Sequence, residues 1–378
     1  MAFNATKLAF RLSTGKKVEC SMRIGLICPY SLTVPGGVQG QVLGLAKTLR
    51  SLGHPVRVLG PCDGPPPDTG VTPLGMSIPT TANGSIAPIA PDVPCALRTI
   101  RALRDESFDI LHLHEPLAPG PTLTALLLAP VPMLGTFHAA GKSLAYDLLK
   151  GPVKWLRNRL DHTVAVSDDA AKMARIALGG EYEVLFNGVE IDKCISANPW
   201  PKENPTIFFV GRHEPRKGLG VLLNAMSHLP PDIRLWVASD GPETAELKAQ
   251  SAGDHRVKWL GRISEEEKLG RMKAADILCA PSLRGESFGV VLLEGMACGT
   301  PVVASDIPGY AKVARQGKDA VLVPAGDSEA FAGAIEKILR NSDQAEILSI
   351  QGMKRVESFS MKRLAETYLE SYEAILTN

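Results

Sequence analysis

The chain has 378 residues, of which 45% are hydrophobic and 21% charged, and its 41 Lys and Arg residues nearly balance its 40 Asp and Glu residues. This length suffices for two domains, because a single hydrophobic core stops growing near about 250 to 300 residues. The balanced charge excludes a global field that would recruit nucleic acid, and no stretch reaches the ~18 apolar residues that a membrane span needs. We therefore expect a two-domain globular protein without a nucleic-acid partner.

The cysteines and the N-terminus indicate where the chain resides. Its seven cysteines are scattered and form no CxxC pair, which is typical of reduced thiols and predicts a cytoplasmic location. Residues 1–21 are basic and contain no continuous apolar run of the kind a secretory signal has. We expect them to form a disordered extension.

From Arg23 onward, short apolar runs alternate with amphipathic runs, and this alternation indicates βαβ units around a parallel sheet. Residues 61–94 are rich in proline and glycine, so we predict a long surface loop there. A second alternating series begins at Thr206, after a proline-rich stretch without periodicity. The predicted strands are 23–28, 54–60, 108–114, 131–138, 162–167 and 182–189, then 207–212, 233–239, 256–261, 276–282, 301–306 and 320–324.

The restart of the alternation predicts two Rossmann-like domains at 22–190 and 206–355, joined by a linker at 191–205. We expect a C-terminal helix at 356–378 to pack back toward the first domain. In open parallel sheets ligands bind at the carboxyl ends of the strands, so two facing domains would form one deep cleft between them.

The first candidate motif is Pro-Gly-Gly-Val-Gln, which contains Gly36 and Gly37 and lies between a strand and a helix. Glycines let the backbone approach a ligand, and the N–H groups of a helix N-terminus favour a diphosphate. A tight turn is the alternative explanation. The motif is not GxGxxG, and no acidic residue ends the next strand, which argues against an NAD-dependent dehydrogenase.

The second motif, Gly-Arg-His-Glu-Pro-Arg-Lys-Gly, follows the first strand of the second domain. Arg212 and Lys217 are placed to converge on one anion and to stabilise the charge of a leaving diphosphate. The alternative is a solvated basic turn.

The third motif runs from Gly285 to Glu294 after the strand at 276–282. Glu286 precedes a predicted helix, Ser287 and Gly289 offer backbone N–H groups, and Glu294 lies inside the helix. Ser287 as a helix cap is the structural alternative, but it leaves Glu294 within an apolar run unexplained.

At these motifs, and at the stretches CPYSLTVPGGVQ, FDILHLHEP and GTFHAAGKS, the chain resembles the retaining GT-B glycosyltransferases. The spacing from Glu286 to Glu294 matches that family's E-x7-E motif. Within the family the chain resembles the actinobacterial phosphatidylinositol mannosyltransferases. The resemblance implies an α/β fold of two facing Rossmann-like domains, the first binding the acceptor and the second the nucleotide sugar.

The resemblance also implies roles for individual residues. The catalytic set would be Arg212, Lys217, His138 and Glu286, with the two cations on the donor phosphates, Glu286 on sugar hydroxyls and His138 near the sugar and acceptor. The donor-binding set would be Gly36, Gly37, Ser287, Phe288, Gly289, Glu294 and Ile263, with Glu294 on the ribose. The acceptor-binding set would be Tyr30, Gln39, Lys142, Asn83 and Ser85.

Three positions depart from the subfamily pattern, since Thr33 replaces an aspartate, Ala82 a tyrosine and Pro88 an arginine. Subfamily members also bind anionic membranes through a basic amphipathic helix, and here such a helix would carry Arg98, Arg101 and Arg104. The resemblance therefore implies a peripheral position at the cytoplasmic face of the plasma membrane.

The expected reaction is a front-face transfer of mannose from GDP-mannose to phosphatidylinositol, in which the departing phosphate accepts the hydroxyl proton. No His, Asp and Glu cluster has metal-ligand spacing, so we expect no required cofactor, with magnesium as a stimulant at most. Three alternatives remain: a UDP-sugar-dependent retaining transferase with another lipid, inositol phosphate or polysaccharide acceptor, an inactive nucleotide-sugar-binding subunit, and a nucleotide-sugar epimerase.

Overall fold

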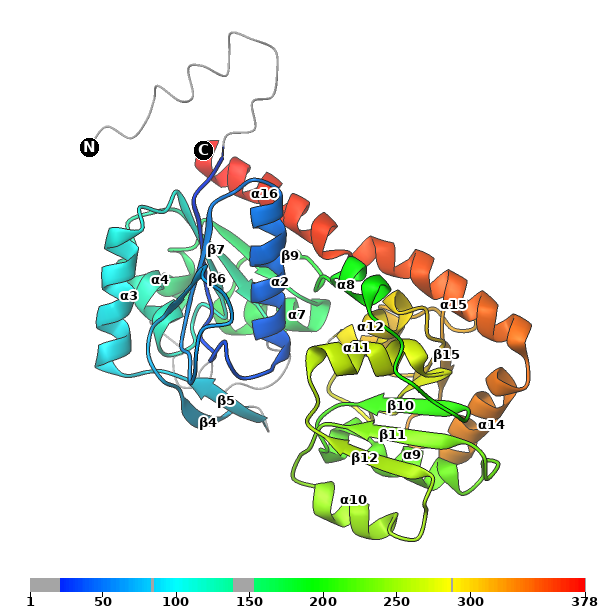
Figure 1. The fold of residues 1–378 in the computed structure, drawn as a ribbon. Helices are drawn as coiled ribbons and strands as arrows, with labels where there is room; N and C mark the ends of the chain where they lie inside the picture. The colour runs from blue at the N-terminus through cyan, green and yellow to red at the C-terminus, as the bar shows by residue number, and fades with distance from the viewer. Residues whose placement is uncertain (1–20, 83–84, 139–152, 287, 378) are drawn as a thin grey trace, which may run out of the picture.

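The structure is a computed structural model that describes residues 21–82, 85–138, 153–286 and 288–377. It contains two open parallel sheets, each with helices on both faces, that lie side by side (Figure 1). Every strand predicted from the sequence is present. The α/β prediction of two Rossmann-like parallel sheets is therefore confirmed.

The first sheet has the strand order β3-β2-β1-β6-β7-β8-β9, and all of its pairings are parallel. The order reverses direction between β1 and β6, which is where open sheets of this kind bind ligands. Its strands are β1 (Ile24–Ile27), β2 (Val56–Gly60), β3 (Val71–Pro73), β6 (Ile110–His114), β7 (Met133–Phe137), β8 (His162–Ala165) and β9 (Glu183–Val184). Its helices are α2 (Gly37–Ser51), α3 (Val93–Asp105), α4 (Pro121–Leu128), α6 (Val153–Arg157) and α7 (Asp168–Leu178).

Residues 61–94 differ from the predicted irregular loop. They contain the edge strand β3 and an antiparallel hairpin of β4 (Ile78–Ala82) and β5 (Ser85–Ile89). Prolines are tolerated in both places, because Pro73 ends an edge strand and Pro79 faces Pro88 across the hairpin, where neither needs an N–H donor. The Pro88 carbonyl instead accepts a hydrogen bond from the Ser31 N–H at 2.9 Å, which holds the hairpin beside the end of β1.

The second sheet has the order β12-β11-β10-β13-β14-β15, again wholly parallel, with its reversal between β10 and β13. Its strands are β10 (Thr206–Val210), β11 (Arg234–Ala238), β12 (Val257–Gly261), β13 (Ile277–Ala280), β14 (Val302–Ser305) and β15 (Val321–Val323). Its helical elements are α8 (Ile191–Ser196), the 3₁₀ turn η2 (Pro215–Lys217), α9 (Leu219–Met226), α10 (Thr244–Gln250), α11 (Glu265–Ala274), α12 (Val290–Ala297), α13 (Pro308–Ala311), α14 (Ser328–Leu339), α15 (Ser342–Val356) and the 3₁₀ turn η3 (Glu357–Phe359).

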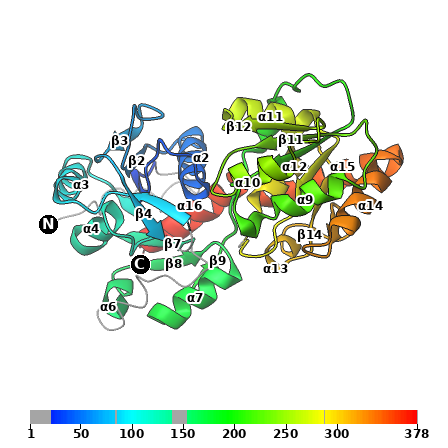
Figure 2. The same cartoon turned by 90° about the horizontal axis from the view of Figure 1, so that it is seen from below.

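The chain passes between the two sheets twice. After η3 it returns to the first sheet as α16 (Met361–Thr377), which lies beside α2 (Figures 1 and 2). The two passages pair with each other, because the Val189 N–H donates to the Phe359 carbonyl at 2.9 Å and the Met361 N–H donates to the Val189 carbonyl at 2.8 Å. The buried side chains of α16 belong to the core of the first sheet, and they are Met361, Ala365, Tyr368 and Tyr372.

Helix α2 is fixed to the first of these passages by Gln41. Its side chain donates from Nε2 to the Gly188 carbonyl and accepts from the Gly188 N–H at Oε1, both at 2.8 Å. The side chain is buried, so both bonds are shielded from water. The helix whose N-terminus carries Gly36 and Gly37 is thereby held to the connection between the domains.

We predict that Gln41→Met, which keeps the side-chain length, lowers the thermal midpoint. The substitution leaves the buried Gly188 N–H and carbonyl without partners, at a cost of about 2 to 3 kcal/mol in unfolding free energy. Gln250→Met, on the exposed surface of α10, is the matched control. Equal midpoints for the two variants in calorimetry would contradict a stabilising role for the Gln41 bonds.

Candidate active site

A large cavity of about 2670 Å³ lies between the carboxyl ends of the two sheets and is lined by residues of both. The volume exceeds the roughly 300 to 1,000 Å³ of typical ligand pockets, so there is room for a donor and an acceptor together. Segments that follow β1, β6 and β7 line one side. Segments that follow β10, β11 and β12, together with α12, line the other.

On the first side, the N-terminus of α2 faces the cavity. Gly36 is its N-cap and makes no side-chain capping bond, and Gly36 and Gly37 both line the cavity. A Cβ on Gly36 would meet Gln39 Oε1 at 2.4 Å, so a larger residue there would displace the Gln39 side chain. Tyr30 and Gln39 line the same side, and the Gln39 amide donates to the Ser31 carbonyl at 3.4 Å. This wall therefore presents helix N–H groups to an anion.

On the second side, Glu214 holds two arginines. Its carboxylate lies 3.1 Å from Arg212 Nε and 2.9 Å from Arg216 Nε, and its side chain is only 6% exposed. Arg212 and Arg216 both line the cavity. A buried carboxylate between two guanidinium groups orients them, so Glu214 is an organiser of the cationic loop that the motif alone did not reveal.

Lys217 and Glu286 form an ion pair at 2.7 Å between Lys217 Nζ and Glu286 Oε1, and Arg216 Nη1 contacts the same oxygen at 3.0 Å. The structure thus brings together two residues of the predicted catalytic set. Lys217 and Glu286 do not line the cavity, whereas Arg216, which contacts Glu286, does. A sugar hydroxyl or a phosphate would have to compete with this ion pair.

Two glycines allow the close approach of these loops. A Cβ on Gly218, which has φ +66°, would lie 2.0 Å from the Pro281 carbonyl oxygen, and a Cβ on Gly309 would lie 1.8 Å from the Glu286 carbonyl oxygen. Both contacts are with backbone, which cannot move aside cheaply. The glycine after Lys217 is therefore required to seat the cationic turn against the segment that follows β13.

Beyond Glu286, the N-terminus of α12 is built without a side-chain cap, because Gly289 at φ +87° is its N-cap. The Phe288 side chain is buried and stacks on Phe186 at 5.1 Å between ring centroids, so only its backbone is available to a ligand. Ser287 lies outside the described residues. Ile263, which the resemblance assigns to donor binding, lines the cavity.

Glu294, on α12, also lines the cavity and forms an ion pair with Lys268. Lys268 Nζ lies 2.9 Å from Glu294 Oε1 and 3.0 Å from Glu265 Oε2. Burial and these two carboxylates act in opposite directions on the Lys268 pKa, and the net effect is to raise it. Lys268 and Glu265 both line the cavity, but no sequence motif singled them out. Only their position beside Glu294 reveals them.

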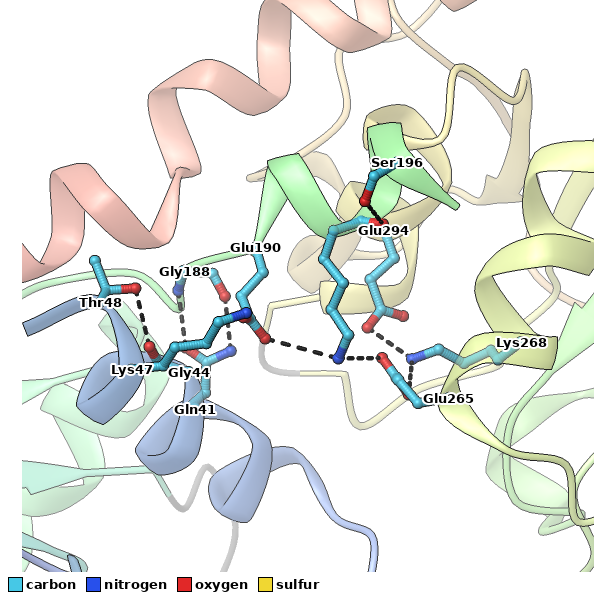
Figure 3. Close-up of polar contacts among 11 residues, drawn as sticks. Gln41, Gly44, Lys47, Thr48, Gly188, Glu190, Ser196, Glu265, Lys268 and Glu294 are labelled. Atoms are coloured by element: carbon cyan, nitrogen blue, oxygen red, sulfur yellow. Dashed lines mark hydrogen bonds and ion pairs between the residues drawn. The ribbon is translucent and has the colours of Figure 1, made fainter. Parts of the chain in front are cut away.

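Figure 3 shows that these charges continue toward the first domain. Lys193 lies 3.7 Å from Glu265 and 3.8 Å from Glu190, and Lys47 of α2 lies 3.1 Å from Glu190. Alternating charges therefore cross the cavity wall from α2 to Glu294.

His138 lines the cavity at the end of β7. Its backbone N–H donates to Glu115 Oε1 at 2.6 Å, and its Nε2 lies 2.9 Å from His114 Nδ1. Burial lowers the pKa of His138 to about 3, so the ring is neutral at pH 7. A neutral imidazole acts here as a hydrogen-bonding group rather than as a charge.

The predicted acceptor residues are described only in part. Tyr30 and Gln39 lie together on the cavity wall beside the hairpin, whereas Lys142 and Asn83 lie outside the described residues. Ser85 pairs with Ala82 in the backbone of the hairpin. Thr33, at one position that departs from the subfamily, accepts a hydrogen bond from the Asp63 N–H at 2.9 Å. In the part of the chain that the structure describes, no group of three or more His, Cys, Asp or Glu side chains is arranged to hold a metal.

Comparison with known proteins places this cavity in a family. Residues 35–193 match the family described as Glycosyltransferase Family 4, and residues 190–355 match Glycosyl transferases group 1. The phosphatidyl-myo-inositol mannosyltransferase of Mycobacterium leprae is 40% identical over 371 residues, which cover 94% of this chain and 98% of the relative. The chain belongs to the phosphatidyl-myo-inositol mannosyltransferase family. The Mycolicibacterium smegmatis member is 37% identical over 94% of both chains.

Solved structures confirm the GT-B fold of this family member. Sucrose-phosphate synthase from Thermosynechococcus elongatus superposes with a TM-score of 0.74 at 20% identity and covers 94% of this chain and 99% of that one. Anabaena HepE, solved with UDP and glucose, superposes with a TM-score of 0.73 at 19% identity and covers 93% of this chain and 100% of its own. The resemblance to GT-B glycosyltransferases is confirmed at the level of family and fold.

We predict that Glu214→Ala weakens GDP binding by about tenfold, although it removes a negative charge from an anion site. The loss follows because Arg212 and Arg216 no longer have the carboxylate that orients them. Glu266→Ala on the exposed side of α11 makes the same charge change away from the cavity and is the control. Isothermal titration measures both, and tighter GDP binding by Glu214→Ala would show that net charge outweighs orientation.

Proposed function

We propose that this protein transfers mannose from GDP-mannose to phosphatidylinositol with retention of configuration at the sugar carbon. The observation that carries the proposal is the 40% identity along nearly the whole chain to a phosphatidyl-myo-inositol mannosyltransferase. The site supports it, because Arg212, Arg216, Lys268 and Glu294 line a cavity large enough for a second substrate, and Arg216 contacts the Lys217–Glu286 ion pair. Residues 22–190 would bind the acceptor and residues 206–355 the donor.

In this proposal the protein contributes positioning and electrostatics. Arg212, Lys217 and the N-terminus of α12 would stabilise the diphosphate as the glycosidic bond breaks, and α2 would approach it through Gly36 and Gly37. The acceptor hydroxyl would attack from the face that the phosphate leaves, and a phosphate oxygen would take its proton. These cations would perform the charge stabilisation that a metal supplies in other transferases, so no cofactor is required and magnesium would act only as a stimulant.

The catalytic proposal predicts that purified protein converts GDP-mannose and phosphatidylinositol into a mannosylated lipid and GDP. Lys217→Ala should lower kcat by about 10²- to 10³-fold because one preorganised cation is lost from the diphosphate. Lys318→Ala, exposed in the second domain, should leave turnover unchanged. Turnover with UDP-glucose but not with GDP-mannose would contradict the proposed donor. Conversion of the donor sugar in the absence of an acceptor would indicate an epimerase. Normal turnover in Lys217→Ala would show that Lys217 has no role in the mechanism.

We also propose that α3 brings the enzyme to an anionic membrane surface at the cytoplasmic face of the plasma membrane. Val93, Leu97 and Ile100 are apolar and exposed on this helix, with Val93 at 70% and Leu97 at 61% exposure. Arg101 and Arg104 extend the same surface, although both contact Asp105. The described part of the chain has no helix long and apolar enough to span a bilayer. An apolar face with basic residues beside it suits interfacial docking.

This surface predicts salt-sensitive association with phosphatidylinositol-containing vesicles. The double variant Arg101→Gln/Arg104→Gln should bind about 30-fold more weakly at low salt, since each basic residue near an anionic surface contributes about 1 kcal/mol. Lys337→Gln/Arg340→Gln on the exposed side of α14 makes the same charge change in the other domain. Equal vesicle cosedimentation of the two double variants would contradict docking through α3.

A further inference from the structure

Three histidines lie in contact at the carboxyl edge of the first sheet. His112 and His114 come from β6, and His138 follows β7. The rings of His112 and His114 stack with centroids 4.2 Å apart, and those of His114 and His138 stack at 5.2 Å. Burial lowers the pKa of all three rings, so all are neutral at pH 7. Only His138 lines the large cavity, and the proposed reaction assigns no role to the other two.

The inner end of the stack is fixed by α16. His112 Nδ1 lies 2.7 Å from the Tyr372 hydroxyl, and His112 Nε2 lies 2.7 Å from Thr136 Oγ1. Thr136 Oγ1 in turn lies 3.1 Å from the Tyr368 hydroxyl. Both nitrogens of His112 are therefore engaged, and its ring forms a rigid surface on which His114 stacks.

The outer contact is one hydrogen bond between His114 Nδ1 and His138 Nε2, at 2.9 Å. Two neutral imidazoles share a single proton in such a bond, so the tautomer of one ring dictates that of the other. Because Nε2 of His138 faces His114, Nδ1 is the ring nitrogen left for the cavity. Whether Nδ1 carries a proton depends on which ring donates.

The surroundings of His114 determine which ring donates the hydrogen bond between His114 and His138. His114 is 2% exposed, and its Nε2 is buried with no hydrogen-bond partner among the described residues. The small cavity beside it has a volume of about 10 Å³, at the lower limit for one water. Besides the two histidines, Leu45, Leu185, Phe186 and Leu364 line it together with Gln41, Asn187 and Tyr368, and the side chains of Gln41 and Tyr368 are already hydrogen-bonded to Gly188 and Thr136. A buried N–H without an acceptor is rarer and costlier than a buried lone pair without a donor. His114 therefore carries its proton on Nδ1.

Glu115 holds the backbone of His138 while His114 holds the ring. Glu115 has φ +50°, in the left-handed region that a residue with a side chain rarely adopts, and its Oε1 accepts the His138 N–H at 2.6 Å. Strained backbone of this kind persists only where surrounding contacts fix it. His138 is thus constrained at its side chain by His114, which ends β6, and at its main chain by Glu115, which follows β6.

We propose that His114 is a positioning residue that donates its Nδ1–H to His138 Nε2 and thereby fixes His138 in the tautomer that presents an Nδ1–H to the cavity. That N–H is suited to donate to a hydroxyl oxygen of the bound sugar or acceptor. The contribution to catalysis rests on the proposed function, whereas the tautomer itself does not.

The test combines ¹⁵N NMR of histidine-labelled protein with steady-state kinetics. The His138 signals are assigned by their loss in His138→Gln. We expect wild-type His138 to be protonated at Nδ1. We expect His114→Leu to lose this preference and to lower kcat about tenfold with an unchanged donor KM. His114→Asn, which keeps an N–H near the Nδ1 position, should restore both properties, and Tyr372→Phe, which alters only the far side of the stack, should leave kcat near the wild-type value.

The assignment would be overturned if wild-type His138 were protonated at Nε2, or if His114→Leu had an unchanged kcat. It would also be overturned if His114→Asn and His114→Leu lost kcat equally, because His114 would then be only a packing residue. If His114→Leu fails to fold, the tautomer of wild-type His138 and the kcat of His114→Asn still test the assignment. A wild-type protein that shows the predicted tautomer but does not convert GDP-mannose and phosphatidylinositol would refute the proposed function and not the tautomer.

Discussion

The paired hydrogen bonds between Gln41 and Gly188 are the contact on which the geometry of the cleft depends. They tie the middle of α2 to the segment that leaves the first domain, and that segment pairs in turn with the returning chain at Phe359 and Met361. The N-terminus of the same helix faces the cavity. The glycine turn at the N-terminus of α2 is therefore held in position relative to the connection between the two domains.

The charges around the cleft are nearly balanced. Glu286 contacts Arg216 and Lys217, Glu214 contacts Arg212 and Arg216, and Glu294 contacts Lys268. These ion pairs restrain the long, flexible side chains of the cations. They also set a cost, because an incoming phosphate or sugar must replace a protein carboxylate. The site thus favours a ligand that satisfies both signs of charge together, as a nucleotide sugar with its phosphates and hydroxyls does.

The sequence predicted the sheets well because parallel buried strands appear as apolar runs with helical runs between them, and all of the predicted strands are present. It failed at β3 and at the hairpin of β4 and β5, where edge positions tolerate the prolines that had indicated a loop. The motifs found residues that follow strand ends, such as Arg212 and His138. They missed Glu214, Lys268 and His114, whose roles depend on partners that only folding brings near.

The position of α16 has a consequence for how the protein is made. Its side chains Met361, Ala365, Tyr368 and Tyr372 complete the core of a sheet whose first strand begins at Ile24. During translation, the second domain can fold around its own sheet before α16 is available to pack against the first domain. The first domain begins to be translated before the second, but its core is complete only after α16 has been made.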